Sequence, residues 1–187
     1  MEAKHHQITE IDPDDDIVVA ARHDPGQFVA LYDRYVQQVY RYVRMRVPHE
    51  QAAEDITSQV FLTALARIDS LRSEGSFAAW LFRVARNAVQ DTYRARSTSS
   101  VEAEVLEALP DMDPGPEALA LAGENAVALR ALIDTLRPEQ QHVLALRFGA
   151  DLSATEIGAM LDKSPEAVRV ALHRAIKELR QRYKNDH

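Results

Sequence analysis

The segment 153–180 constrains the fold more than any other part of the chain, because it predicts two short helices joined by a tight turn. Its sequence is SATEIGAMLDKSPEAVRVALHRAIKELR. Ser153 and Glu156 form an S-x-x-E capping box, which gives the first helix a defined start. Ser164 is a candidate N-cap for the second helix, and Pro165 follows at the first helical position, where its missing N–H costs no hydrogen bond. The pattern is typical of a helix-turn-helix, a motif that lays its second helix in the major groove of DNA.

The second helix of this motif has an apolar face and a basic face. The apolar residues recur at helical spacing, which predicts that they are buried; they are Val168, Leu172, Ile176 and Leu179. Facing outward are Glu166, Arg169, Val170, His173, Arg174 and Lys177. In the turn, Asp162 and Lys163 stand where many such motifs carry Gly and an aliphatic residue. The alternative to DNA binding is an ordinary helical hairpin with a solvated basic face.

Charge is distributed unevenly along the 187 residues, whose net charge is −7. Residues 1–25 hold 2 basic and 7 acidic side chains, and residues 97–127 hold 0 and 7. The blocks between and after them are mildly basic, with 10 basic and 7 acidic side chains in 26–96 and 10 and 8 in 128–187. Basic charge is concentrated where a groove-reading helix needs it, and modest positive charge fits a protein that does not bind DNA tightly alone.

The chain contains no cysteine, which excludes disulfides and thiolate metal sites and permits a reducing cytoplasm. Its seven histidines are scattered. We therefore expect no metal, no cofactor and no catalytic site, and a helical enzyme is the weakest of the candidate functions. The acidic N-terminus does not resemble a signal peptide, and no apolar run approaches the roughly 20 residues that span a bilayer. A cytoplasmic protein without membrane insertion is the expectation.

Helical spacing of apolar residues nearly everywhere predicts an all-α protein of two small domains joined by a flexible acidic linker. We expect an acidic tail at 1–24, a first domain at 25–96, the linker at 97–122 and a second domain of four short helices at 123–187. The first domain should hold three helices, starting near Phe28, Gln51 and Phe77. The buried stripe predicted for the middle helix consists of Ala53, Ile56, Val60, Phe61, Ala64, Leu65 and Ile68.

Four segments, in this order, resemble the extracytoplasmic-function sigma factors, which belong to the sigma-70 family of bacterial RNA polymerase specificity subunits. They are FVALYDRYVQQVYRYVRMRV at 28–47, AEDITSQVFLTALARI at 53–68, GSFAAWLFRVARNAVQDTYRAR at 75–96, and LRPEQQHVLALRFGADLSATEIGAMLDKSPEAVRVALHRAIKELR at 136–180. The resemblance implies a non-enzymatic protein that binds core polymerase, directs it to minus-thirty-five and minus-ten promoter elements and helps to open the duplex.

The resemblance also assigns residues to these tasks. The helix near Ala53 would dock on the clamp helices of the largest polymerase subunit through Asp55, Ser58 and Gln59, although Ser58-Gln59 replaces the family's usual Gln-Glu pair. The second domain would contact the flap of the second-largest subunit. An anti-sigma protein is a further expected partner.

Two sets of residues would contact promoter DNA. For the single strand of the minus-ten element, where a flipped base needs a polar pocket and a stacking surface, they are Arg72, Ser73, Glu74, Ser76, Phe77, Arg83, Arg86, Asn87, Asp91, Arg94 and Arg96. For the minus-thirty-five element they are Ser164, Glu166, Ala167, Arg169, Val170, His173, Arg174 and Lys177. A stand-alone helix-turn-helix regulator that binds a palindrome as a dimer remains the alternative, but it leaves 75–96 unexplained.

Overall fold

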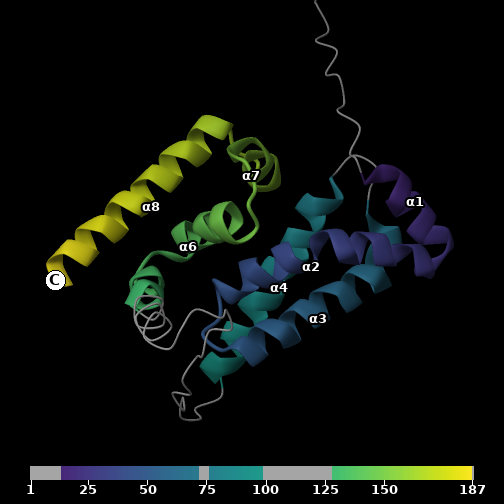
Figure 1. Cartoon of the computed structure of the whole chain (residues 1–187), viewed down its shortest axis with the longest axis horizontal. Coiled ribbons are helices and arrows are strands. Elements are labelled where there is room, and N and C mark those ends of the chain that lie inside the picture. The colour runs from purple at the N-terminus through teal and green to yellow at the C-terminus, as the bar shows by residue number, and fades with distance from the viewer. Residues whose placement is uncertain (1–13, 72–75, 99–127, 187) are drawn as a thin grey trace, which may run out of the picture.

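The computed structural model describes residues 14–71, 76–98 and 128–186, and these residues form helices and turns without a strand. The first domain contains α1 (Asp15–His23), α2 (Phe28–Arg44), α3 (Glu50–Arg67) and α4 (Phe77–Thr98). Single turns of 3-10 helix, Pro25–Gln27 and Ile68–Ser70, follow α1 and α3. In Figure 1, α2, α3 and α4 lie side by side as a bundle, with α1 across one end.

The core of the first domain forms where α2, α3 and α4 turn their apolar stripes inward. Leu31, Val39, Val60 and Leu81 are all fully buried. Each such side chain contributes about 1.5–3 kcal/mol by leaving water. The stripe predicted for α3 is largely correct, but Leu65 is 37% exposed. Ala66 and Arg67, which follow it, are exposed as well.

The N-terminal segment differs from the predicted acidic tail at 1–24, because residues 15–23 form α1 and pack on α2. Asp14, which directly precedes α1, is fully buried and accepts hydrogen bonds from Arg34 and Tyr35. Val18 is buried in the same core. Aspartates suit this position, since carboxylates near a helix N-terminus interact favourably with the helix dipole. The first domain therefore begins no later than Asp14, and residues 1–13 lie outside the described part.

The second domain contains a helix at 128–134, α6 (Pro138–Leu144), a π-helical turn (Ala145–Gly149), α7 (Ala154–Leu161) and α8 (Pro165–Asp186). Four helices lie among the described residues 128–186, as many as predicted for the domain, although α8 is not short and runs six residues beyond Arg180. Leu136, Leu144 and Ala175 form a small buried cluster between α6 and α8. The predicted start of the first of these helices, and the linker from residue 99 onward, lie outside the described residues.

The helix-turn-helix has the predicted local structure. The hydroxyl of Ser153 accepts the Glu156 N–H at 3.2 Å, and the Glu156 carboxylate accepts the Ser153 N–H at 2.7 Å, which completes the capping box. Asp162 closes α7 in the left-handed conformation, with φ 54° and ψ 50°. A Cβ on Gly158 would lie 2.6 Å from the carbonyl oxygen of Lys163, so the turn can close only over a glycine. At the start of α8, the Ser164 hydroxyl accepts the Ala167 N–H.

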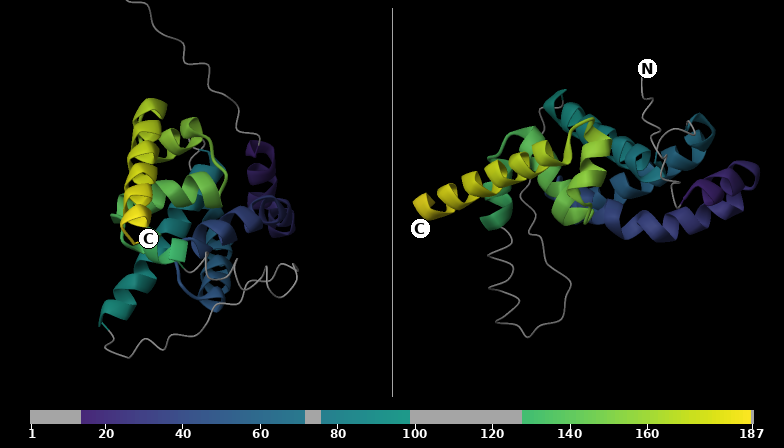
Figure 2. Two further views of the ribbon diagram at one scale, coloured as in Figure 1. Left: turned by 60° about the vertical axis from the view of Figure 1, so that its left-hand side comes forward. Right: turned by 90° about the horizontal axis from the view of Figure 1, so that it is seen from above.

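The two domains pack against each other instead of standing apart. Val143, Leu146, Leu152 and Ile157 of the second domain belong to the same buried cluster as the core of the first domain. Figures 1 and 2 show α6 and α7 between α8 and the bundle of the first domain. The two predicted domains therefore share one hydrophobic core. We call this packing of the second domain on the first the closed arrangement.

Candidate nucleic-acid interface

One face of α4 carries the polar residues predicted to hold single-stranded DNA. Arg83, Arg86 and Asn87 are exposed and lie at i, i+3 and i+4, which places them together on the helix. One turn further on, Arg94 pairs with Asp91 at 3.2 Å, and both side chains are exposed. The face therefore offers guanidinium groups for phosphates and one amide that can donate to and accept from a base.

The other residues of the predicted minus-ten set are placed less favourably or are not described. Ser76 is exposed. Phe77 is 1% exposed, and its ring packs against Phe28, Tyr35 and Trp80, so it belongs to the core and offers no stacking surface. The loop residues Arg72, Ser73 and Glu74, and the side chain of Arg96, lie outside the described part of the structure.

The outer face of α8 carries the residues predicted to read double-stranded DNA. All eight predicted residues are exposed, namely Ser164, Glu166, Ala167, Arg169, Val170, His173, Arg174 and Lys177. Val168 and Ala175 face inward and are buried. Glu166 pairs with Arg169 at 2.9 Å. The pKa of the Glu166 carboxyl is lowered, first by a hydrogen bond from its own backbone N–H at the helix start and then by Arg169. A guanine would compete with Glu166 for the Arg169 guanidinium.

The exposed face of α3 combines polar and apolar side chains. Asp55, Ser58 and Gln59 are exposed, as predicted for residues that contact another protein. Leu62 follows at helical spacing on the same face and is 64% exposed. Sequence analysis did not single out Leu62, because an apolar residue near a predicted buried stripe is usually assigned to the core. Single exposed leucines are common on protein surfaces, but this one lies within the same polar face of α3 and adds apolar area to it.

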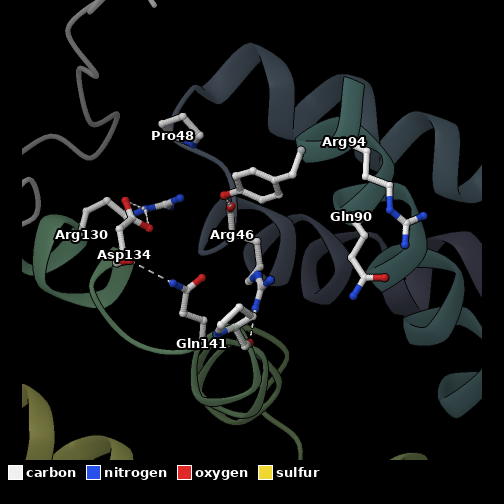
Figure 3. A pocket seen from close by; sticks show the side chains of 9 residues that line it. Arg46, Pro48, Gln90, Arg94, Arg130, Asp134 and Gln141 are labelled. Carbon is white, nitrogen blue, oxygen red and sulfur yellow. Dashed lines mark hydrogen bonds and ion pairs between the residues drawn. The ribbon is translucent and has the colours of Figure 1, made fainter. Parts of the chain in front are cut away.

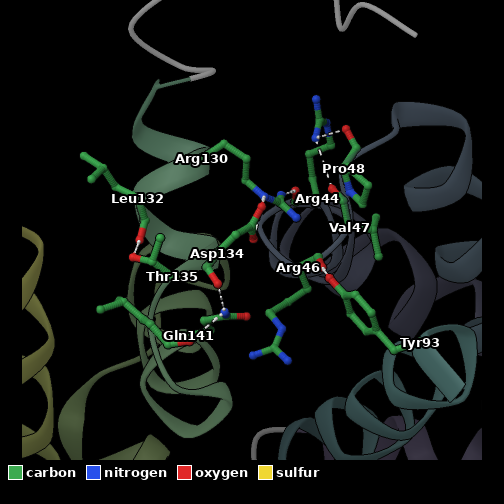
Figure 4. A network of polar contacts seen from close by, with 11 residues as sticks. Arg44, Arg46, Val47, Pro48, Tyr93, Arg130, Leu132, Asp134, Thr135 and Gln141 are labelled. Atoms are coloured by element: carbon green, nitrogen blue, oxygen red, sulfur yellow. Dashed lines mark hydrogen bonds and ion pairs between the residues drawn. The ribbon is translucent and has the colours of Figure 1, made fainter. Parts of the chain in front are cut away.

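A polar seam joins the two domains beside the C-terminal end of α2. Arg46 donates to the carbonyl oxygen of Pro138 at 3.1 Å, and Arg130 donates to that of Arg44 at 2.7 Å. Tyr93 of α4 donates to the Arg46 carbonyl oxygen. Arg46, Tyr93 and Arg130 also line a cavity of about 550 Å³ whose lining comes from both domains (Figure 3). Figure 4 shows the polar contacts beside it. Backbone carbonyls of each domain are thus held by arginines of the other.

An apolar contact adjoins the seam, and its centre is Tyr42 of α2. The Tyr42 ring packs edge-on against Phe82 and against His142 of α6. The Tyr42 hydroxyl and Nδ1 of His142 form a hydrogen bond of 2.9 Å. Burial, reinforced by the positive charges of Arg86 and Arg46, lowers the pKa of His142 to about 3, while burial raises the pKa of Tyr42 to about 12. His142 is therefore neutral at physiological pH.

The described residues contain no cluster of three or more histidines and carboxylates suited to a metal ion. No helix among them combines the length and apolar character needed to cross a membrane.

Residues 31–98 match Sigma-70 region 2, and residues 132–181 match Sigma-70, region 4. The chain is 36% identical over 155 residues to the ECF RNA polymerase sigma factor BldN of Streptomyces coelicolor, a match that covers 81% of this chain and 58% of BldN. It is 32% identical over 148 residues to the ECF RNA polymerase sigma factor SigD of Mycobacterium tuberculosis, covering 76% of this chain and 70% of SigD. The chain belongs to the ECF sigma factors.

A solved structure supports the fold of this sigma factor. The structure of CnrH in complex with the cytosolic domain of CnrY aligns with a TM-score of 0.68 at 21% identity, covering 92% of this chain and 97% of CnrH. Region 2 of the sigma factor corresponds to the bundle of α2, α3 and α4, and region 4 to the helices from 132 to the greater part of α8.

Sequence analysis of this sigma factor missed the residues that join the two regions. Tyr42 lies at i+3 from Val39 and i+7 from Tyr35, so the helical period of α2 contains a signal for its burial. His142 and Gly149 carry no such signal, because their partners are about a hundred residues away in the sequence.

Proposed function

We propose that this chain is a sigma factor that binds core RNA polymerase, recognises a minus-thirty-five and a minus-ten element and stabilises the opened promoter. The observation that carries the proposal is that one chain holds regions 2 and 4 in order, with Arg83, Arg86 and Asn87 of α4 and all eight predicted residues of α8 exposed. The chain contributes binding and positioning, and catalysis stays with the polymerase, so the protein is not an enzyme. Its site of action is the cytoplasm, with the polymerase.

Core polymerase would bind the exposed face of α3. Asp55, Ser58 and Gln59 supply polar contacts around Leu62, and this combination suits the clamp helices of the largest subunit. Region 4 would contact the flap of the second subunit, which holds α8 over the upstream element.

Double-stranded DNA would be read by the first three turns of α8. Arg169 is the strongest candidate for a base contact, since a guanidinium forks onto guanine, and Arg174 and Lys177 are suited to phosphates. Single-stranded DNA would run along α4, with Asn87 on a base and Arg83 and Arg86 on phosphates. Phe77 is left out of this proposal because it is buried.

An anti-sigma protein is part of the proposal, since members of this family are commonly held inactive by such a partner. The similarity to CnrH, whose structure was solved with the cytosolic domain of CnrY, supports a partner of this kind.

Run-off transcription on a library of genomic fragments tests the proposal. Core RNA polymerase with the chain should yield discrete transcripts that core polymerase alone does not. If instead the purified chain shifts duplex operator DNA strongly as a dimer without polymerase, the proposal is wrong and the chain is a stand-alone regulator.

A further inference from the structure

The cavity between the two domains has the size and the charge of a site for a small anion. Its volume of about 550 Å³ lies within the range of about 300–1,000 Å³ that is usual for ligand sites. The charged side chains that line it are Arg46, Arg94, Arg130 and Asp134. Three guanidinium groups therefore share the cavity with one carboxylate, and a cleft lined mainly by one sign of charge attracts ligands of the opposite sign.

Arg46 is a buried charge without a carboxylate partner in the described part of the chain. The residue is 7% exposed and takes part in none of the ion pairs between described residues. Its Nη1 donates to the Pro138 carbonyl oxygen at 3.1 Å, whereas its Nε is buried without a hydrogen-bond partner among those residues. A guanidinium group stays charged at physiological pH, and buried charges are normally paired. Arg46 thus offers a donor and a positive charge to a group that enters the cavity.

Arg130 provides a second donor, from the other domain. Its Nε donates to the Asp134 carboxylate at 3.2 Å, and its Nη1 donates to the Arg44 carbonyl oxygen at 2.7 Å. Its Nη2 is buried and has no hydrogen-bond partner within the described ranges. Figures 3 and 4 show the side chains of Arg46 and Arg130 directed into the space between the domains. Guanidinium groups recognise phosphate through paired N–H donors, so two of them at one cavity suit a phosphate group.

Another part of the cavity wall suits a planar ring. The Tyr93 ring is 42% exposed, and its hydroxyl donates to the Arg46 carbonyl oxygen, which fixes the position of the ring. Aromatic side chains stack on nucleobases and tolerate all of them, because every base has a π-face. Gln90 also lines the cavity and is half-buried. Its amide can both donate to and accept from the edge of a ring.

The two walls of the cavity are held in place by a close contact between the domains. A Cβ added to Gly149 would lie 2.9 Å from the Tyr42 Cα and 3.0 Å from the Arg41 carbonyl oxygen. The Arg41 side chain donates to the carbonyl oxygen of Gly149 at 2.9 Å. Walls that are already in position reduce the cost of ordering them around a ligand.

We propose that this cavity binds a small phosphorylated ligand that carries a planar ring, such as a nucleoside monophosphate. The phosphate would accept hydrogen bonds from Nε of Arg46 and Nη2 of Arg130, and the ring would stack on Tyr93. Because the two arginines belong to different domains, the bound ligand would stabilise the contact between them. This inference goes beyond the proposed function and does not depend on it.

Isothermal titration calorimetry on the full chain, at constant ionic strength in sodium chloride, tests the inference. The probes are AMP, GMP, adenosine and inorganic phosphate. AMP or GMP should bind at one site per chain with a Kd below about 1 mM. Adenosine, which lacks the phosphate, should bind at least about tenfold more weakly than AMP. Equal binding of adenosine and AMP, or no binding of either nucleotide, would overturn the inference.

Three variants test whether the nucleotide occupies this cavity. Arg46→Lys keeps the charge but loses the fork of donors, and Arg130→Gln removes the second guanidinium group. Each should weaken AMP binding about tenfold. Gln90→Glu keeps the size of the side chain and adds a carboxylate to the wall, so it should weaken AMP binding without changing the circular dichroism. Arg180→Gln, at an exposed arginine of α8, is the charge-matched control and should bind AMP as wild type does. Unchanged AMP affinity in Gln90→Glu, or in both arginine variants, would refute the assignment.

Tyr93→Leu separates the ring from the phosphate. The variant should bind AMP about tenfold more weakly and inorganic phosphate as wild type does, since stacking concerns the ring alone. Tyr32→Leu, at a tyrosine of α2 that is 41% exposed, is the control. Unchanged AMP affinity in Tyr93→Leu would contradict stacking on this residue and the inferred ligand class with it.

Single-stranded DNA is the other occupant that the charge of the cavity allows, since Arg94 also belongs to the residues predicted to hold the minus-ten strand. A labelled pool of random 15-nucleotide strands measures this alternative. If the strands bind in a manner that depends on Arg46 and AMP does not displace them, the cavity is part of the nucleic-acid surface and the inference is wrong. These measurements need neither polymerase nor promoter, so their outcome is independent of the transcription test.

Discussion

The hydroxyl of Tyr42 lies 2.9 Å from Nδ1 of His142, a residue one hundred positions away in the sequence and in the other domain. Tyr42 is fully buried and His142 is 7% exposed. The pair therefore reports directly on whether the two domains are in contact.

Tyr42→Phe should weaken the closed arrangement and leave the first domain folded. The substitution keeps the ring and its contact with Phe82, and removes only the hydrogen bond, leaving a buried imidazole nitrogen without its partner. The expected loss is about 1–2 kcal/mol in the free energy of urea unfolding. Tyr32→Phe, at a tyrosine that is 41% exposed, is the matched control and should change little. Equal stability of wild type and Tyr42→Phe would show that the bond contributes nothing.

The closed arrangement should become less stable in mild acid. In the closed arrangement the pKa of His142 is about 3, against the ordinary 6.5. The closed form therefore binds fewer protons than the open or unfolded chain. The stabilisation is complete above pH 6.5 and is lost as the pH falls toward 3. At pH 5 the loss is about 2 kcal/mol, from 1.36 kcal/mol per pH unit.

Urea unfolding of wild type and His142→Asn at pH 7.5 and pH 5 measures this effect. The asparagine does not titrate, so the difference between the two proteins should shrink by about 2 kcal/mol at the lower pH. His173→Asn, at an exposed histidine of α8, serves as the control. A pH-independent difference between wild type and His142→Asn would contradict the prediction.

Asp162→Gly should stabilise the helix-turn-helix. Asp162 has a φ of 54°, which costs an L-residue free energy that glycine does not incur. The gain is about 0.5 kcal/mol, because glycine also adds entropy to the unfolded chain. Asp162→Ala should instead lose stability, since alanine tolerates this conformation less well than aspartate. Thermal unfolding of the three proteins gives the order, and alanine ranking above glycine would be inconsistent with the turn as described.

Arg169→Ala should reduce transcription from promoters that depend on the minus-thirty-five element. A lost fork onto guanine costs about 1–3 kcal/mol and relaxes the preference at that base. Run-off transcription on promoter variants measures both effects. Arg180→Ala, at an exposed arginine further along α8, is the control. Core polymerase should bind both variants as it binds wild type. Weaker core binding by Arg169→Ala would contradict the proposal that this face of α8 contacts promoter DNA.

Asn87→Ala should impair promoter opening more than formation of the closed promoter complex. The amide is proposed to act on an unpaired base, which exists only after the duplex melts. Permanganate reactivity of unpaired thymines measures opening, and gel retardation of the holoenzyme measures the closed complex. Asn185→Ala at the end of α8 should affect neither. Equal defects of Asn87→Ala in both assays would exclude a role confined to the opened strand.

Local features of the fold were predictable because the interactions that create them are local. The capping box of Ser153 and Glu156 joins residues three apart, and the start of α8 at Pro165 follows from the fixed φ of proline. The exposure of the α8 residues that are predicted to contact DNA follows in the same way from one helical period.

Features that depend on distant partners were not predictable from spacing. The helix α1 is only nine residues long, and its position depends on the hydrogen bonds that Asp14 accepts from Arg34 and Tyr35, about twenty residues away. Phe77 follows a polar turn, yet it is buried because Phe28 and Tyr35 surround it. Nothing in the local sequence pattern of region 4 or of α4 indicates that the two pack against each other.

The π-helical turn between α6 and α7 makes this part of the chain sensitive to length. The Ala150 N–H donates to the Ala145 carbonyl oxygen, five residues back, so the turn holds one residue more than an α-helical turn. One residue corresponds to about 100° of rotation about a helix axis. Deleting a single residue from 145–148 would rotate α7 and α8 relative to α6 and turn Gly149 away from α2. Related sequences that keep the contact between the two domains can therefore vary the side chains of 145–149 more freely than the number of residues in this segment.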